Sequence, residues 1–458
     1  KGEGSESITT NENRSNKVRA LGVAFAYNEI NNTAQTTIGK DAQIGSADSS
    51  LRDVQLENQI YYPNKFLESF GTWDKIKNLG MSPKTYLSNL GKPIGFLISG
   101  SVNSHAKTTI SGEAKVDKDN TVKGVDTSGA FAGNFNLLTN KSENIIKGAI
   151  YARNLKTKSV NEIDYVLFSG HPLVELTLFD LPGWFNIAAN WENKNNESRT
   201  DRRNSKLNQI KSDLLQKGNV AKSGVGAEFT YEQPNNIART KIESTATIQV
   251  KEAIKNESIN QGRSIHIITA LGQSKDWGVQ GGLDITSGEG NTTSFEVNDP
   301  INVEASSLTS KSNDNVSRIN VNGSIQYSNS IGVGIAIITA DEKRKTRNKL
   351  TSKRSSINIH DAIDLHAENS GELIQLSIAG SISKEESKKD TSQTNQTLTT
   401  SKNLGSRGQN ANKMQFAGAG SVGWVSKEHL ATNKIEGTQE KVITLPSSIQ
   451  TIAKNNYD

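Results

Sequence analysis

The sequence predicts an all-β protein, a right-handed parallel β-helix (β-solenoid) with short helical insertions. Three observations lead to this prediction. Apolar and polar residues alternate over many short stretches, these stretches recur in the same order along the 458 residues, and only 33% of the residues are hydrophobic. Alternation with a period of two is typical of strands with one buried face. A thin core with many polar turns fits a repeat fold better than a thick globular core.

The first element is the stretch at 21–39, LGVAFAYNEINNTAQTTIG. Small and apolar residues alternate, an asparagine-rich segment follows, and alternation then resumes. We expect a first strand, a polar corner that contains Asn31 and Asn32, and a second strand. An isolated antiparallel hairpin gives no reason for this order to return, so its return favours stacked coils. The same order is found at 95–116, 224–250 and 278–297.

Later elements repeat parts of this pattern. Further copies of the first strand lie at 319–327, 374–382 and 416–425, and a third alternating element lies at 41–48, 300–307 and 357–371. The copies of the first strand are mostly about forty to fifty-five residues apart, a spacing typical of repeat proteins. Small residues that suit a tight inner face are Gly22, Ala24, Ala26, Gly418 and Gly420. With coils about 4.8 Å apart, roughly fifteen to twenty coils would form a rod about 70–100 Å long.

We expect residues 1–458 to form a single rod, an internal fragment of a larger protein. Two segments break the strand pattern and predict helical insertions, at 57–94 and at 195–220, because their apolar residues recur at helical spacing. These insertions either contact a receptor or only pad the rod. The segment 383–410 has almost no apolar residue and predicts a flexible polar excursion.

Charge and cysteine content narrow the function. The chain has 53 basic and 48 acidic residues, and its net charge of +5 is spread widely, whereas a dedicated nucleic-acid binder is usually more basic. The sequence has no cysteine, which excludes disulfides, thiolate metal sites and thiol nucleophiles. No apolar stretch approaches the length of a membrane-spanning helix.

Two motifs point to chemistry that the strand pattern argues against. GAGSVG at 418–423 matches the dinucleotide fingerprint, but it lies inside an alternating stretch rather than between a strand and a helix. HDAIDLH at 360–366 offers His and Asp ligands, but with the isoleucines and Leu365 facing inward around a bend at Asp361, the two histidines are expected to be solvated. A nucleophile elbow is also missing, so we predict no catalytic residue, no cofactor and no metal.

The segment 341–354 is densely basic and is the candidate binding site. It could bind sulfated glycans, anionic lipid or nucleic acid, or it could be a solvated loop between two strands. Its cationic residues are Lys343, Arg344, Lys345, Arg347, Lys349, Lys353 and Arg354.

The repeats at 22–44 and 417–437 resemble those of the large leukotoxin-type filamentous adhesins of anaerobic Gram-negative bacteria. In that family a glycine-alternating strand, a motif similar to NEINN and a further short strand recur many times. Similar repeats occur in other autotransporter and two-partner-secretion passengers. The resemblance covers most of the chain outside the two helical insertions and the polar excursion.

The resemblance implies an exported β-helical rod, secreted or held at the bacterial cell surface, that acts as an adhesin, a cytotoxin or both. It also implies an outer-membrane translocator during export and a host-cell receptor or glycan as partner. Lateral self-association is a further expectation, and no specific nucleic acid is expected. The first hypothesis is therefore a structural and interaction segment without enzymatic activity. The alternative is a β-helical polysaccharide-active enzyme that uses carboxylates on an outer face.

Overall fold

A computed structural model describes residues 2–9, 18–47, 52–64, 104–170, 223–383, 397–398, 416–437 and 443–457, with short gaps at 114, 117–121, 124, 275, 289, 329, 354–355, 445 and 447. Every regular element in these ranges is a β-strand, and they contain no helix of the length and hydropathy that crossing a membrane requires. The strands pair in parallel except for two short antiparallel pairings. The predicted all-β class is confirmed.

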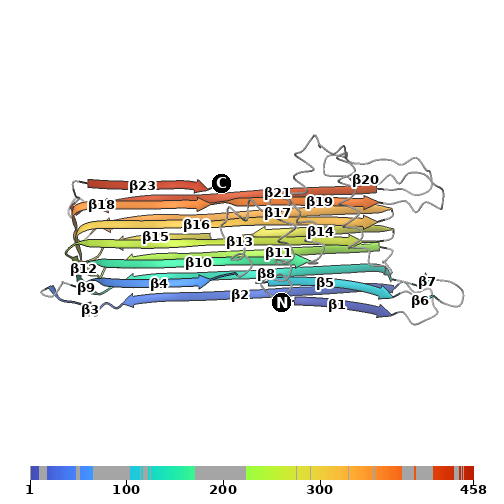
Figure 1. Ribbon diagram of the computed structural model, residues 1–458, viewed down its shortest axis with the longest axis horizontal. Helices are drawn as coiled ribbons and strands as arrows, with labels where there is room; N and C mark the ends of the chain where they lie inside the picture. Colours follow the sequence, from blue (N-terminus) through green and yellow to red (C-terminus); the bar gives the residue numbers. More distant parts are fainter. Residues whose placement is uncertain are drawn as a thin grey trace, which may run out of the picture.

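One large sheet, which we call sheet B, has six levels. A level is one long strand, or two shorter strands in line, that pairs with the strands above and below it. Most of its strands are 20–22 residues long, which corresponds to about 70 Å. Figure 1 shows these long strands stacked side by side. In order they are β2 (Val18–Ile38), β8 (Val125–Ile146), β11 (Ser223–Ile242), β14 (Trp277–Thr286) in line with β15 (Gly290–Asn298), β17 (Ile331–Ser352) and β21 (Phe416–Gly437).

The other large sheet, sheet A, holds the returning strands. Its long members are β10 (Leu155–Gly170), β13 (Ala253–Gln273), β16 (Asn302–Ser328), β18 (Ser356–Gly371) and β19 (Leu373–Ser383). Other strands that join it are β1 (Gly2–Thr9), β4 (Val54–Tyr62), β5 (Ser104–Glu113) and β23 (Ser448–Tyr457). Near the end where the chain turns from sheet B into sheet A lie the short strands β3 (Gln43–Ile44), β9 (Ala149–Ala152), β12 (Thr247–Val250) and β22 (Ile443–Thr444).

From β11 to β18 the chain alternates between the two sheets with a nearly constant period of 53–55 residues. Val225 in β11 pairs with Val279, and Val279 pairs with Val333, so equivalent residues are 54 positions apart. Ile254 of β13 pairs with Leu308 of β16 at the same interval of 54. Between other levels the interval is longer, because segments outside the described residues lie between them. The register nevertheless resumes over the full strand length on either side.

The predicted polar corners are wrong. Asn31 and Asn32 lie inside β2, and Pro234 lies inside β11, so each of these levels is one long strand where two short strands were expected. The copy at 278–297 does have a break, between β14 and β15. Polar residues remain inside a strand when the next level offers them hydrogen-bond partners. The described part of sheet B is consequently six levels, or about 25 Å, deep rather than fifteen to twenty coils.

The copies of the first strand also divide between the sheets. Those at 319–327 and 374–382 pair with each other in sheet A, whereas the stretches at 224–250 and 416–425 begin strands of sheet B. Among the small residues expected to face inward, Ala24 and Ala26 are buried as predicted. Gly418 and Gly420 are not inward, because Gly418 pairs with Val333 on the outer side of sheet B.

The apolar core lies at the end where the short strands close the turn. Ile150, Leu155, Ile254 and Leu308 belong to it, and each is at most 2% exposed. Burial of these side chains provides the main stabilising free energy of this end, about 2 kcal/mol for each fully buried residue. One inward position is apolar at every level of sheet B, namely at Ile38, Ile146, Ile242, Val297, Leu350 and Ile435.

In the other half of the molecule, hydrogen bonds join the two sheets. The Oγ atom of Ser324 in β16 donates to the carbonyl oxygen of Gln280 (2.8 Å), and the Oγ atom of Ser381 in β19 donates to that of Gly332 (2.6 Å). Small inward residues permit this close approach. A Cβ atom built on Gly334 would lie 2.2 Å from the carbonyl oxygen of Gly380, so a larger residue would push the sheets apart.

The prediction of a helical insertion at 57–94 is wrong for its first six residues, because 57–62 belong to β4. Alternate residues of this strand, Leu56, Asn58 and Ile60, are buried, and this burial holds the segment in sheet A. The part of this insertion from residue 65 onward lies outside the described residues. All of the second expected insertion, 195–220, also lies outside them.

The expected polar excursion at 383–410 is described at two places only. Ser383 is the last residue of β19, and Thr397–Leu398 forms the short strand β20, which pairs antiparallel with the end of β19. The rest of this segment lies outside the described residues.

Candidate functional site

A ladder of asparagines crosses the interior near the middle of sheet B. From Nδ2 to Oδ1, Asn32 donates to Asn140 (2.8 Å), Asn140 to Asn236 (2.9 Å) and Asn236 to Asn291 (2.9 Å). Parallel, in-register pairing forms the ladder, because it places identical side chains about 4.8 Å apart with their amide groups in line. At its end, Asn291 donates to Oδ1 of Asp314 in β16 (3.3 Å).

A second, shorter ladder in sheet A reaches the same carboxylate. Asn161 of β10 donates to Asn260 of β13 (2.9 Å), and Asn260 donates to Oδ2 of Asp314 (3.4 Å). Both oxygens of a buried aspartate therefore accept hydrogen bonds from asparagines of opposite sheets. Such bonds to the carboxylate partly replace the water that it loses on burial.

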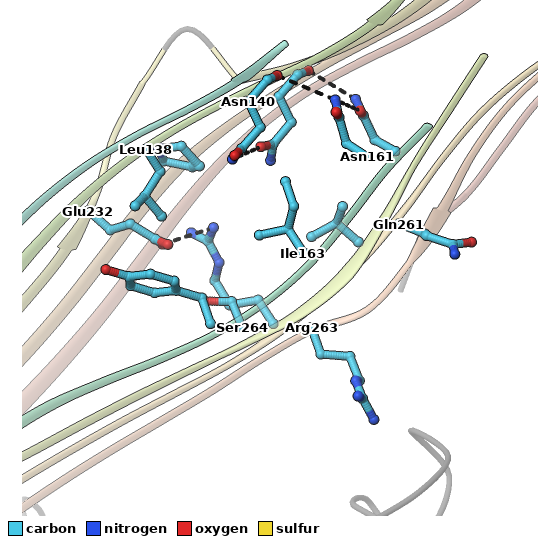
Figure 2. A pocket seen from close by; sticks show the side chains of 14 residues that line it. Leu138, Asn140, Asn161, Ile163, Glu232, Gln261, Arg263 and Ser264 are labelled. Atoms are coloured by element: carbon cyan, nitrogen blue, oxygen red, sulfur yellow. Dashed lines mark hydrogen bonds and ion pairs between the residues drawn. The ribbon is translucent and has the colours of Figure 1, made fainter. Parts of the chain in front are cut away.

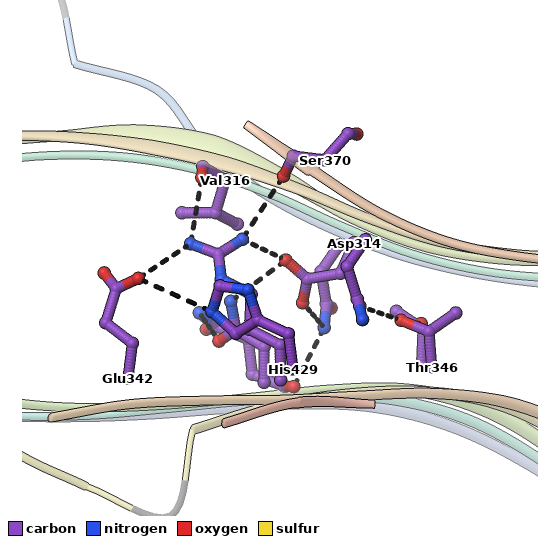
Figure 3. A network of polar contacts seen from close by, with 12 residues as sticks. Asp314, Val316, Glu342, Thr346, Ser370 and His429 are labelled. Atoms are coloured by element: carbon purple, nitrogen blue, oxygen red, sulfur yellow. Dashed lines mark hydrogen bonds and ion pairs between the residues drawn. The ribbon is translucent and has the colours of Figure 1, made fainter. Parts of the chain in front are cut away.

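Asp314 is the first of a row of buried charges (Figure 3). Arg344 pairs in register with Asn291, which places its Nη1 atom 2.6 Å from Oδ1 of Asp314 and its Nη2 atom 3.7 Å from Oε2 of Glu342. On the far side of this cluster, Nε2 of His429 lies 4.0 Å from the Glu342 carboxylate. Asp314, Glu342 and Arg344 are each at most 7% exposed. The guanidinium of Arg344 thus bridges two carboxylates away from solvent.

Arg318 links this cluster to a second one. Its Nε atom lies 3.9 Å from Glu342, and its Nη2 atom lies 3.0 Å from Oε2 of Glu232. The same Glu232 oxygen lies 2.8 Å from Nε2 of His266, whose Nδ1 atom lies 3.2 Å from Asp284. A continuous chain of ionisable groups therefore runs from Asp284 to Asp314 through the interior.

The clusters shift the pKa values of their members. Burial alone would lower the pKa of His266, but the charges of Glu232 and Asp284 outweigh burial and raise it to about 9. Burial would raise the pKa of Glu232, but the charges of Arg318 and His266 lower it to about 2. Burial raises the pKa of Asp314, and Arg344 offsets only part of that effect. His266 and Glu232 are consequently both ionised near neutral pH.

A small cavity lies beside the ladders (Figure 2). Asn140, Asn161, Glu232 and Ser264 are among its lining residues, and its volume of about 30 Å³ has room for about two water molecules. Oδ1 of Asn161 and Oγ of Ser264 are buried without a hydrogen-bond partner in the protein. The cavity is therefore suited to ordered water. Figure 2 shows Arg263 pointing away from it.

The buried charges are suited to a structural role. A histidine between two carboxylates has the groups for acid–base chemistry, but a general acid or base must come within hydrogen-bond reach of a substrate. His266 and Asp284 are 0% exposed and Glu232 is 1% exposed, so no substrate can reach them. Within the described ranges, no three His, Cys, Asp or Glu side chains are grouped so as to hold a metal ion.

The candidate cationic residues lie on β17, so 341–354 is mostly strand and not a loop. Lys343, Lys345, Arg347 and Lys349 alternate with inward residues and face outward from sheet B. Arg347 contacts Glu296 (2.7 Å), and Lys349 lies 3.7 Å from Glu436. Lys345 is exposed. These four residues form a straight outward row, which we call the cationic row.

The remaining candidate cations do not belong to this row. Arg344 faces the interior and is 3% exposed, so it cannot contact an external partner and its inclusion in the binding set is wrong. The reason is the period of two, which points neighbours in a strand to opposite faces. Lys353 follows the end of β17 and is exposed, and Arg354 lies outside the described residues.

The two sequence motifs have the expected backbone structure. GAGSVG at 418–423 lies inside β21, with no helix after it. In β18, Ile359, Ile363 and Leu365 are buried, and the pairing with β16 shifts by one residue at this point, as a bend at Asp361 requires. The side chain of His360 is 54% exposed and lies 3.8 Å from Glu304.

The sequence did not predict that Glu232, His266, Asp284 and Arg318 form a group. Glu232 alone could have been predicted to face the interior, because every second residue of β11 counted back from the apolar Ile242 lies on the same face. The partners could not be found in this way, since His266 and Arg318 come from other strands and contact Glu232 only after folding.

Known proteins offer no template for this arrangement, because no family model, no curated protein and no solved structure matches the chain.

Proposed function

We propose that this chain is a structural and interaction segment of an exported bacterial filamentous adhesin or leukotoxin, secreted or held at the cell surface. In this proposal the chain winds as a right-handed parallel β-helix, and each turn adds one long strand to each sheet. The nearly constant interval of 53–55 residues supports the winding, because parallel strands need a return connection and the opposite sheet supplies it. The repeats at 22–44 and 417–437, with their resemblance to filamentous adhesins, support the class.

The cationic row is the observation on which the partner proposal depends. Successive outward residues of a strand are about 6.6 Å apart, so Lys343, Lys345, Arg347 and Lys349 hold their charges in line over about 20 Å. A strand in the interior of a sheet keeps this spacing with little loss of entropy on binding. The matching partner is an extended polyanion of the host-cell surface, and a sulfated glycan has this chemistry.

Binding of the full 458-residue chain to host cells and to immobilised heparin tests the proposal. Deletion of 341–354 would remove part of β17, so charge reversal is the better change. We expect Lys343→Glu with Lys345→Glu to weaken binding at least tenfold, about 1.4 kcal/mol, and added salt to weaken the unchanged chain.

The matched control is Lys255→Glu with Lys311→Glu, which changes the net charge equally at exposed positions of sheet A. This variant should bind as the unchanged chain does. No binding by the unchanged chain, or an equal loss in the control, would contradict the proposal.

The buried and ion-paired carboxylates of the two clusters do not support the enzymatic alternative. Glu232, Asp284 and Asp314 are buried inside the molecule, and Asp164 forms an ion pair with Arg263. Of the outward-facing carboxylates, Glu296 is paired with Arg347. The proposed function therefore does not include enzymatic activity.

A further inference from the structure

One half of the outer face of sheet B is apolar. Four neighbouring outward positions of β2, at residues 21, 23, 25 and 27, have in-register equivalents at all six levels, and none of these residues is charged. We call these equivalents the apolar face. Its most exposed side chains are Leu21, Phe25, Tyr27, Val422 and Trp424, which are 56–61% exposed.

The apolar face is larger than an isolated protein normally exposes. Four positions about 6.6 Å apart and six levels about 4.8 Å apart cover about 750 Å². Contiguous apolar patches of this size usually mark an interaction site. A stable interface buries about 800 Å² on each partner, which is close to this area.

The equivalent part of sheet A is already protected from water. Ile265, Val321 and Ile325 alternate with the inward residues His266, Asn320 and Asn322, so they point to the outer side of sheet A. They are nevertheless only 4–8% exposed. Among the described residues, the apolar face of sheet B is therefore the large sheet surface whose apolar side chains lack such cover.

We infer that the apolar face binds the same face of a second copy of this chain, in a two-fold dimer whose strands run antiparallel across the interface. Two sheets packed face to face are about 10 Å apart and interdigitate their side chains. A two-fold axis along the stacking direction keeps each level opposite itself and reverses the order of the four positions along the strand. The first position then lies opposite the fourth, and the second opposite the third.

At several levels a small residue comes opposite a large one under this symmetry. In β21, Gly418 comes opposite Trp424 of the other copy, and Gly420 comes opposite Val422. In β14, Gly281 comes opposite Leu283. A Cβ built on Gly420 would meet nothing within 4 Å, and one on Gly281 only ordinary contacts at 3.9 Å, so open space for the partner's larger side chains exists at these two positions. Beside Gly418 the space is partly filled, because the ring of Phe416 lies 2.9 Å from a Cβ built there.

The charges of the outer face agree with the antiparallel arrangement. Lys343, Lys345, Arg347 and Lys349 continue along β17 on one side of the apolar face. Reversal of the strand direction moves the two cationic rows to opposite sides of the interface, where both remain in solvent. A parallel arrangement would bring like charges together, which is unfavourable. The dimer thus leaves the cationic row accessible, and it does not depend on the proposed attachment function.

Sedimentation velocity of the full chain over about 1–100 µM tests the inference. We expect a dimer, and we expect Ile335→Glu, at the centre of the apolar face, to raise the dimer Kd at least tenfold. Lys345→Glu, ten residues further along the same strand, should leave the dimer unchanged while it weakens heparin binding. Circular dichroism verifies the fold, and Val422→Glu is the second variant if Ile335→Glu does not fold.

Cross-linking tests the orientation, and it is simplified because the chain has no cysteine. Val333→Cys and Thr339→Cys occupy the first and fourth positions of β17, so a short bis-maleimide should link a mixture of the two variants far better than either alone. Efficient linkage of either variant to itself would overturn the antiparallel arrangement. A monomeric chain at all concentrations would overturn the dimer, as would a monomer that sediments with phosphatidylcholine vesicles, which would make the apolar face a lipid-binding surface.

Discussion

The two halves of sheet B are built in opposite ways. Near the closed end, the inward residues are apolar, such as Ile146 and Ile242, and the outward ones are polar, such as Lys241. In the other half, Glu232 is buried inward while Phe25 is more than half exposed outward. Apolar alternation therefore identifies one face of a strand but does not tell whether that face points to the interior or to solvent.

Different forces hold the two halves together. The closed end has a hydrophobic core, whereas the other half joins its sheets through asparagine ladders, ion pairs and bonds from serine to carbonyl groups. Each buried hydrogen bond contributes only about 1 kcal/mol net, but an unpaired buried group costs more. The polar half is therefore the more sensitive to removal of a single partner.

The largest effect is expected in the polar half, from Arg344→Met. Loss of the guanidinium leaves Asp314 and Glu342 buried beside each other without their cation, and breaking a buried ion pair in this way costs about 3–5 kcal/mol. Urea unfolding of the full chain measures the free energy. Lys345→Met, the outward neighbour in β17, should change it by less than about 0.5 kcal/mol. Equal losses in both variants would show that Arg344 is not an interior residue.

A slightly smaller effect is expected at the closed end, from Ile146→Ala. This side chain is 0% exposed in the apolar core, and its truncation should cost about 3 kcal/mol. Leu21→Ala removes a similar volume from the outward side of the other half, where the residue is 57% exposed. At a concentration low enough for the chain to be monomeric, Leu21→Ala should lower the free energy of unfolding by less than about 0.5 kcal/mol. A large loss at Leu21 would reverse the assignment of inner and outer faces.

The smallest of the three effects depends on pH. The folded-state pKa of His266, about 9, exceeds the unfolded value of 6.5, so its contribution is fully present below pH 6.5 and is lost as pH rises to 9. Glu232, with a pKa of about 2, contributes above pH 4.5 and loses its contribution as pH falls to 2. Unfolding free energies should fall by at most about 3 kcal/mol between pH 6.5 and 9.

His266→Gln is the control for this pH dependence. It replaces the titrating ring between Glu232 and Asp284 with a neutral amide and should flatten the slope above pH 6.5. An unchanged slope in this variant would assign the pH dependence to other groups.

Much of the local structure could be predicted from the sequence, because alternation is a local signal. It identified the strands and the bend at Asp361, and it placed Ala24 and Ala26 inside. It failed where the outcome depends on other levels. Asn32 reads as a turn residue in isolation, and it stays in a strand because Asn140 accepts its hydrogen bond. Arg344 is a different case, because alternation along β17 alone points it to the interior, where it pairs with Asp314.

The unbroken register on either side of long intervening segments has a consequence for how such a chain can grow. β13 and β14 are connected by residues 274–276, whereas the equivalent strands β10 and β11 are separated by residues 171–222. The pairing of β11 with β8 is nevertheless continuous over its whole length. Doubling a loop costs only about 0.6 kcal/mol in closure entropy. Evolution can therefore lengthen this end freely, and a protein engineer can use it to display foreign peptides without disturbing the sheets.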